Sequence, residues 1–125
     1  MRAHGISPVL LGLWVLVVAL HVYETVTEWT NVLFGFGVFA WSLFPYIAAW
    51  ALASATRRAL LAIVPTALAL LFDSYTLFVV RSSHSSTAAL AYLWTPVRNL
   101  ILIVPLGAGG ALLWLRFWHS DPSAP

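Results

Sequence analysis

Residues 59–80 read ALLAIVPTALALLFDSYTLFVV, and Asp73 is the only charged side chain in this run. A membrane-spanning helix needs about 20 mainly apolar residues, so the run predicts one span. Three further stretches meet the same requirement, at about 6–26, 31–54 and 88–117. The sequence therefore predicts an all-α integral membrane protein that forms a single domain, residues 1–125, with four transmembrane helices.

Composition supports this prediction and excludes several classes of protein. Hydrophobic residues make up 62% of the chain and charged residues 8%, against about 25% charged residues in a soluble domain. A water-soluble enzyme and a disordered chain are excluded. The net charge is +2, which is too small for a nucleic-acid-binding surface. Cysteine is absent, so disulfides and thiolate metal sites are excluded as well.

Short polar connections predict that the four helices run up and down as an antiparallel bundle. Cytoplasmic loops of membrane proteins collect arginine and lysine, and the short loop between the second and third spans contains Arg57 and Arg58. We therefore expect this loop and both termini to lie in the cytoplasm. The acidic residues Glu24 and Glu28 then fall on the outer side.

The start of the fourth span is ambiguous. Ser85, Ser86 and Thr87 precede an apolar run and are typical of a helix N-terminus. The span is then either one long helix that bends at Pro96 or a true span preceded by a short interfacial helix at 87–94. Prolines inside transmembrane helices are common, and they leave backbone carbonyls that need other partners. Pro96 is the best candidate for a hinge because polar residues flank it.

Ionisable residues at membrane depth are costly, so each is a candidate functional residue. From the rise of a helix, Asp73 lies about 10 Å and Arg98 about 12 Å below the same membrane edge. We predict that these two side chains form an ion pair between the third and fourth helices. The pair either fixes the helix register or takes part in a substrate or proton pathway. In a further alternative, Arg98 lies at the lipid headgroups.

A second polar group is expected on the first span. His21, Glu24 and Glu28 are three and then four residues apart, so they share one helical face. Tyr75 and His84 are expected at the same outer level. This outer polar cluster could be a wetted rim, a proton or ion pathway, a metal or haem site, or a partner contact. Two ligands on one helix do not make a metal site, so we predict no metal and no cofactor.

Small residues mark places where membrane helices approach closely. Such residues occur in the fourth span at Gly107, Gly110 and Ala111, and in the second span at Gly35 and Gly37. They would pack helices within the bundle or between protomers. Trp14 and Trp41 fall near mid-membrane, where they either pack inside the bundle or face a partner or cofactor.

Three functions fit these features, and no motif identifies a family. The first is a structural or accessory subunit of a membrane assembly, which the short loops and the absence of a soluble domain favour. The second is a small oligomeric transporter or channel whose outward-facing pathway is lined by Asp73, Arg98, His21 and Glu24. The third is a membrane enzyme or redox subunit that binds a quinone, lipid or metal. The expected partners are the lipid bilayer and further copies of the chain or a larger complex, with no nucleic acid. Abundant alanine, leucine and arginine without lysine indicate a GC-rich bacterial genome. The expected location is the bacterial inner membrane, which the chain would cross several times.

Overall fold

The computed structural model describes residues 7–83 and 90–119 and is helical throughout most of that length. The first three helices are α1 (Pro8–Glu28), α2 (Val32–Thr56) and α3 (Leu60–Ser82). A fourth helical run follows as α4 (Ala91–Arg98), a π-helical segment η3 (Asn99–Ile103) and α5 (Val104–His119). Within these described residues, four helices are each long and apolar enough to cross a membrane, the fourth being Ala91–Trp118. The predicted all-helical membrane protein with four spans is confirmed to this extent.

Local sequence explains where the helices begin and end. Pro8 occupies the first turn of α1, where its missing N–H costs nothing. The Asn31 side chain accepts a hydrogen bond of 3.0 Å from the Phe34 backbone N–H and so caps α2. Arg57 ends α2 in the left-handed conformation, with a φ of 56°. The short loop predicted between the second and third spans, which contains Arg57 and Arg58, is therefore a tight cap at the end of α2.

The fourth span does not break into a separate interfacial helix over the described residues. From Ala91 onward the helix continues through Pro96, which is buried. Only residues 99–103 depart from α-helical geometry. Pro105 follows this segment, and proline cannot donate to the carbonyl four residues earlier. Short π-helical segments of this kind occur often at functional sites. The proposed helix start at Ser85–Thr87 lies outside the described residues.

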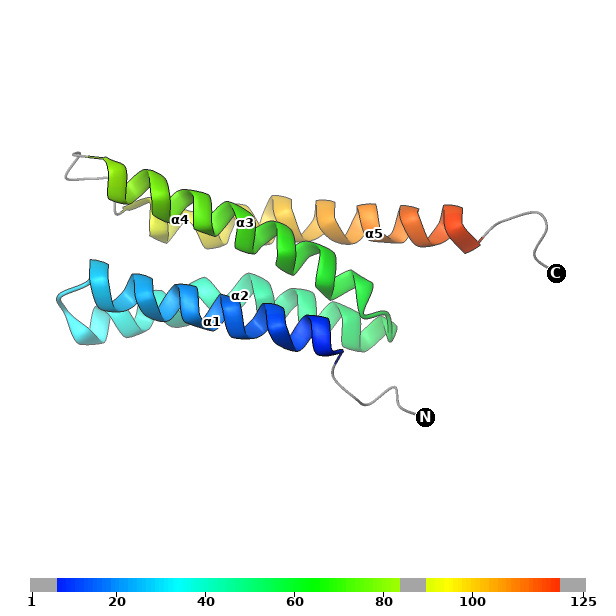
Figure 1. Cartoon of the computed structure of the whole chain (residues 1–125), viewed down its shortest axis with the longest axis horizontal. Coiled ribbons are helices and arrows are strands. Elements are labelled where there is room, and N and C mark those ends of the chain that lie inside the picture. Colours follow the sequence, from blue (N-terminus) through cyan, green and yellow to red (C-terminus); the bar gives the residue numbers. More distant parts are fainter. Residues whose placement is uncertain (1–6, 84–89, 120–125) are drawn as a thin grey trace.

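Two layers of helices make up the structure (Figure 1). Helices α1 and α2 lie side by side in one layer, and α3 lies with α4 and α5 in the other. Helix α3 contacts every other helix. The start of α1, the end of α2 and the end of α5 lie at one end of the molecule, which we call the Pro8 end (Figure 1). The opposite end, where α1 finishes, is called the Glu28 end.

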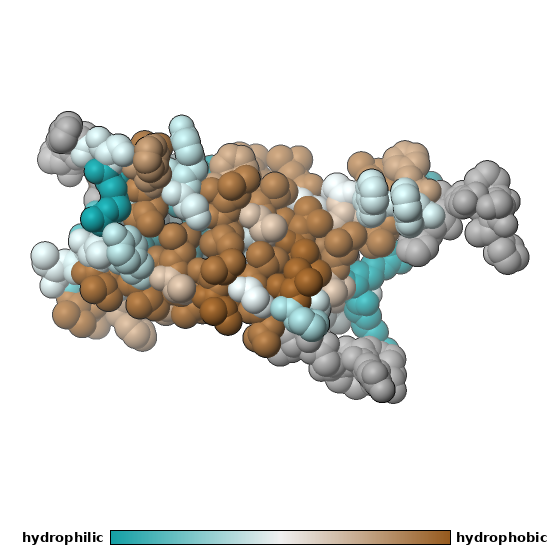
Figure 2. All heavy atoms as spheres, in the orientation of Figure 1, coloured by the Kyte–Doolittle hydropathy of each residue, from teal (hydrophilic) through white to brown (hydrophobic). Residues whose placement is uncertain are grey.

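Small side chains dominate the buried contacts. One core cluster lies toward the Pro8 end and contains Leu10, Ala53, Leu61, Ala62, Ala108 and Ala111. A second cluster at the middle contains Val17, Tyr46, Ala69 and Ile103. Most other large apolar side chains face outward, and Figure 2 shows them as a broad hydrophobic belt with hydrophilic residues toward the two ends. This surface suits a hydrocarbon surrounding, where apolar side chains face lipid.

Candidate functional site

Asp73 on α3 is the centre of a buried polar network. Its Oδ2 atom accepts hydrogen bonds from Tyr46 Oη at 2.5 Å and from His21 Nε2 at 3.2 Å. Its Oδ1 atom accepts one from Asn99 Nδ2 at 2.7 Å. An Arg98 guanidinium nitrogen lies 3.6 Å from the same Oδ1 atom. One carboxylate thus connects the side chains of α1, α2, α4 and η3 to α3.

Arg98 reaches the network from its edge. Its guanidinium donates to Asn99 Oδ1, with distances of 3.4 and 3.1 Å from Nε and a terminal nitrogen. The same group lies 5.4 Å from the centre of the Phe72 ring, which is a favourable cation–π arrangement. Asn99 therefore links the arginine to the carboxylate. The predicted Asp73–Arg98 contact is present in the structure, while its functional role remains a prediction.

The network is almost completely shielded from solvent. His21 is 3% exposed, Glu24 4%, Asp73 2% and Asn99 0%, whereas the Arg98 side chain is 28% exposed. Helix geometry places Asp73 and His21 each more than about 10 Å from the end of their helices. Charged groups at such depth are expensive unless they are paired. Here each of them has a partner of opposite or complementary character.

The imidazole of His21 lies between two carboxylates. Its Nε2 atom faces Asp73, and its Nδ1 atom lies 3.3 Å from Glu24 Oε2 one turn later on α1. Tyr46 and Asn99 already donate to the Asp73 carboxyl group, so Nε2 is assigned as a further donor toward it. A neutral imidazole would then turn a lone pair toward Glu24. A proton between His21 and Glu24 removes this repulsion, so the geometry accommodates one proton at that contact.

The rim of the Glu28 end carries a separate ion pair. Glu28 accepts a hydrogen bond of 2.9 Å from Arg81, whose side chain is 45% exposed. The Arg81 guanidinium also lies over the ring of Tyr23, 5.4 Å from its centre. Glu28 therefore shares a helical face with His21 and Glu24 but bonds to a different partner. The sequence grouped His21, Glu24 and Glu28 by their spacing. In the structure, His21 and Glu24 form a buried pair, and Glu28 forms a pair with Arg81 at the rim.

Two other members of the predicted outer polar cluster are not brought to it. Tyr75 is 66% exposed on α3 and faces away from the interior. His84 lies outside the described residues. Within residues 7–83 and 90–119, no three histidine, cysteine, aspartate or glutamate side chains are grouped so that they could hold a metal ion.

The predicted packing glycines divide into two kinds. A Cβ atom on Gly107 would lie 2.8 Å from Pro65 Cα, and one on Gly35 would lie 3.0 Å from Trp29 Cβ. Ala111 is 2% exposed and belongs to the core. Gly37 and Gly110 instead face open space. Gly107, Gly35 and Ala111 are thus at helix contacts, and Gly37 and Gly110 are not within this chain.

Tyr46 and Asn99 belong to the network but were missed as site residues. Tyr46 lies in an apolar stretch directly after Pro45, and no sequence pattern marks which way it faces. Asn99 follows Arg98, and its own polarity at membrane depth was the available signal. Comparisons with protein-family models, with curated proteins and with solved structures gave no match.

Proposed function

We propose that this small membrane protein is a proton-linked transporter, with the His21–Glu24 contact as its proton-binding group. The observation that carries the proposal is the imidazole held between the carboxylates of Asp73 and Glu24 inside the bundle. Histidine can accept and release a proton near neutral pH. Ionisable groups inside a membrane protein typically form proton relays or substrate pathways. In this proposal, Asp73 holds the imidazole in place, and Arg98 contacts that carboxylate from the edge of the network.

Charge counting supports a single exchangeable proton. With neutral His21, the two carboxylates and the Arg98 guanidinium leave one negative charge uncompensated. Adding one proton at His21 or Glu24 makes the cluster neutral overall. A buried cluster with an unbalanced charge is unfavourable in a medium of low dielectric constant. Proton uptake at this contact therefore changes the balance of the whole network.

Proton uptake tests the proposal directly. The purified protein is titrated from neutral to alkaline pH in detergent, and the bound protons are counted against the His21→Gln variant. We expect the wild type to release about one more proton than this variant, as one titrating group requires. The Glu28→Gln variant is the matched control, since its carboxylate belongs to the rim pair, and it should keep the His21 step. Identical titration by wild type and His21→Gln would contradict the proposal.

A structural or accessory subunit is the second candidate, and the saturation of Asp73 favours it. Three donors from α1, α2 and η3 satisfy this carboxylate, and Arg98 of α4 adds an ion-pair contact, as a device that fixes helix register would require. Vesicles with a pH gradient separate the two candidates. A transporter moves protons across the vesicle membrane, alone or with a cargo, whereas a purely structural network does not. Native mass spectrometry would then identify any partner that co-purifies.

The proposed location is the inner membrane of a bacterium. There the chain would assemble with further copies of itself or within a larger complex. In the proposed orientation both termini and the Arg57–Arg58 cap face the cytoplasm, because arginine accumulates on that side. The Glu28 end then faces outward. A proton would reach His21 from the outside past Glu28 and Glu24, which continue the same face of α1.

Cysteine labelling tests this orientation, because the chain contains no cysteine of its own. Arg58 and Thr30 are both exposed and lie at opposite ends of α2. A membrane-impermeant maleimide should label Thr30→Cys in intact cells and should label Arg58→Cys only after the membrane is opened. The reverse pattern would invert the orientation and move the access side to the cytoplasm.

A further inference from the structure

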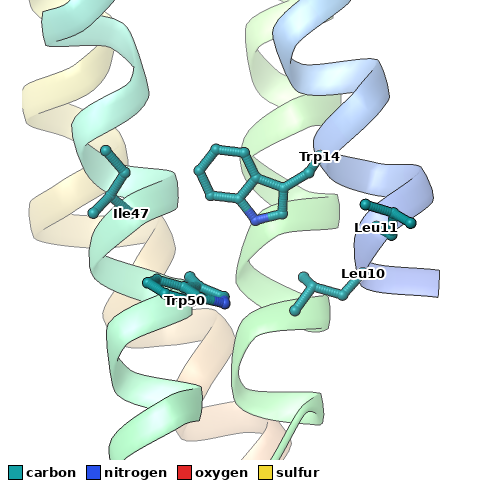
Figure 3. Close-up of a pocket in the computed structure, with 5 residues that line it drawn as sticks. All are labelled: Leu10, Leu11, Trp14, Ile47 and Trp50. Carbon is teal, nitrogen blue, oxygen red and sulfur yellow. The ribbon is translucent and has the colours of Figure 1, made fainter. Parts of the chain in front are cut away.

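An apolar pocket lies between α1 and α2 toward the Pro8 end. Its volume is about 400 Å³, and it is lined by Leu10, Leu11, Trp14, Ile47 and Trp50 (Figure 3). In Figure 3 the indole of Trp14 extends from α1 toward α2, and the ring of Trp50 lies across the space below it. The side chains that line the pocket carry no charge. The pocket is separate from the polar network at the middle of the bundle.

We propose that this pocket binds an uncharged aromatic molecule that is dissolved in the membrane. The volume falls in the range of small-molecule sites, about 300–1,000 Å³. A charged ligand would lose its hydration here without gaining a side chain of opposite charge. Leu11, Ile47 and Trp50 are 53%, 47% and 46% exposed, so the pocket opens on the face that lipid surrounds. The ligand therefore enters from the bilayer.

The two indoles decide between an aromatic ligand and an acyl chain. Trp14 and Trp50 come from different helices and present ring surfaces to the same space. Aromatic rings gain from stacked or edge-to-face contacts beyond the area that they bury. A rigid ring also loses less conformational freedom on binding than a flexible chain does. Aliphatic walls alone would have sufficed for an acyl chain.

One residue that lines the pocket packs against a member of the polar network. The Trp14 ring packs edge-on against Tyr46 with a centre-to-centre distance of 6.4 Å. Tyr46 in turn donates its hydroxyl proton to Asp73. An occupant that displaces the Trp14 ring therefore acts on Tyr46, a member of the network. If the ligand is also the molecule that the protein transports, that role rests on the proposed function. Binding of the ligand in the pocket does not.

Energy transfer from tryptophan tests binding. The full chain is placed in phosphatidylcholine nanodiscs and titrated with N-phenyl-1-naphthylamine, an uncharged aromatic probe that accepts excitation energy from tryptophan. We expect a saturable phase of one probe per chain. Ile47→Trp, which adds an indole at the half-exposed wall, should abolish this phase. Leu112→Trp is the matched control, because Leu112 is 44% exposed on α5 and lies away from the pocket; this variant should bind like the wild type.

Three outcomes would overturn the inference. The first is energy transfer that rises only in proportion to the probe-to-lipid ratio. The second is equal binding by wild type and Ile47→Trp. The third is quenching by phospholipids with brominated acyl chains that the probe cannot displace, which assigns the pocket to lipid. Proton counting and probe binding by the wild type separate the two proposals. Saturable binding by a wild type that releases no more protons than His21→Gln overturns the proposed function alone, and an extra proton released by a wild type without saturable binding overturns the pocket alone.

Discussion

Replacing Asp73 with asparagine is expected to lower the free energy of unfolding by about 3–5 kcal/mol, the cost of breaking a buried ion pair on one side. The carboxylate accepts from Tyr46, His21 and Asn99. An asparagine side chain offers one acceptor oxygen and turns two N–H donors toward groups that also donate. The Arg98 charge then loses its counterion as well. Thermal unfolding in detergent measures the effect.

Glu28→Gln is the matched control for this substitution. It makes the same carboxylate-to-amide change in the rim pair with Arg81, whose side chain is 45% exposed. Exposed ion pairs contribute between about 0 and 1 kcal/mol, so the loss should stay below about 1 kcal/mol. Equal losses for Asp73→Asn and Glu28→Gln would show that burial of the network contributes nothing to stability.

A double-mutant cycle isolates the part of the effect that Arg98 contributes. The Asp73→Asn and Arg98→Leu variants are measured singly and together. Residues in one hydrogen-bonded network typically couple by about 0.5–3 kcal/mol, and the indirect contact through Asn99 should place this pair within that range. Simple addition of the two single losses would mean that the 3.6 Å contact has no energetic consequence.

The spans were predictable because the thickness of a membrane sets helix length. The expected spans at 31–54 and 59–80 compare with Val32–Thr56 and Leu60–Ser82. Each helix extends about two residues beyond the apolar run, since polar residues such as Arg81 continue the last turn. The π-helical segment was not predictable. Pro105 removes one donor to this segment, but a proline in a helix does not by itself specify π-helical geometry, and the sequence NLILI carries no further mark of it.

The sequence predicted the depth of the site residues in the membrane but not the rotation of each helix about its axis. Counting residues from the helix ends placed Asp73 and Arg98 at one level, and the structure brings them within 3.6 Å. Which other side chains turn toward Asp73 depends on the rotation of each helix about its axis. An apolar helix gives no polar face from which to read that rotation. Tyr46 was therefore missed, and Tyr75 was expected in a cluster from which it faces away.

The glycines show the same limit. A pattern of small residues four apart indicates that a helix is able to approach a neighbour closely, but it does not say which residue touches it. Gly107 contacts the backbone of Pro65 on α3, while Gly110, three residues later, faces open space. Both glycines look equivalent in sequence. Substituting each of them should have different effects on stability.

Gly107→Leu is expected to lower the free energy of unfolding by about 3 kcal/mol, toward the upper end of overpacking effects. The first atom of any side chain there would lie 2.8 Å from Pro65 Cα and 3.0 Å from Pro65 N. These are backbone atoms within helix α3, so they cannot move aside as a flexible side chain would. Helices α3 and α5 would have to separate, and the core around Ala108 and Ala111 would open. Gly110→Leu is the matched control: it adds the same side chain toward open space and should change stability by less than about 0.5 kcal/mol. If the two variants unfold at the same temperature, α5 does not approach α3 through Gly107.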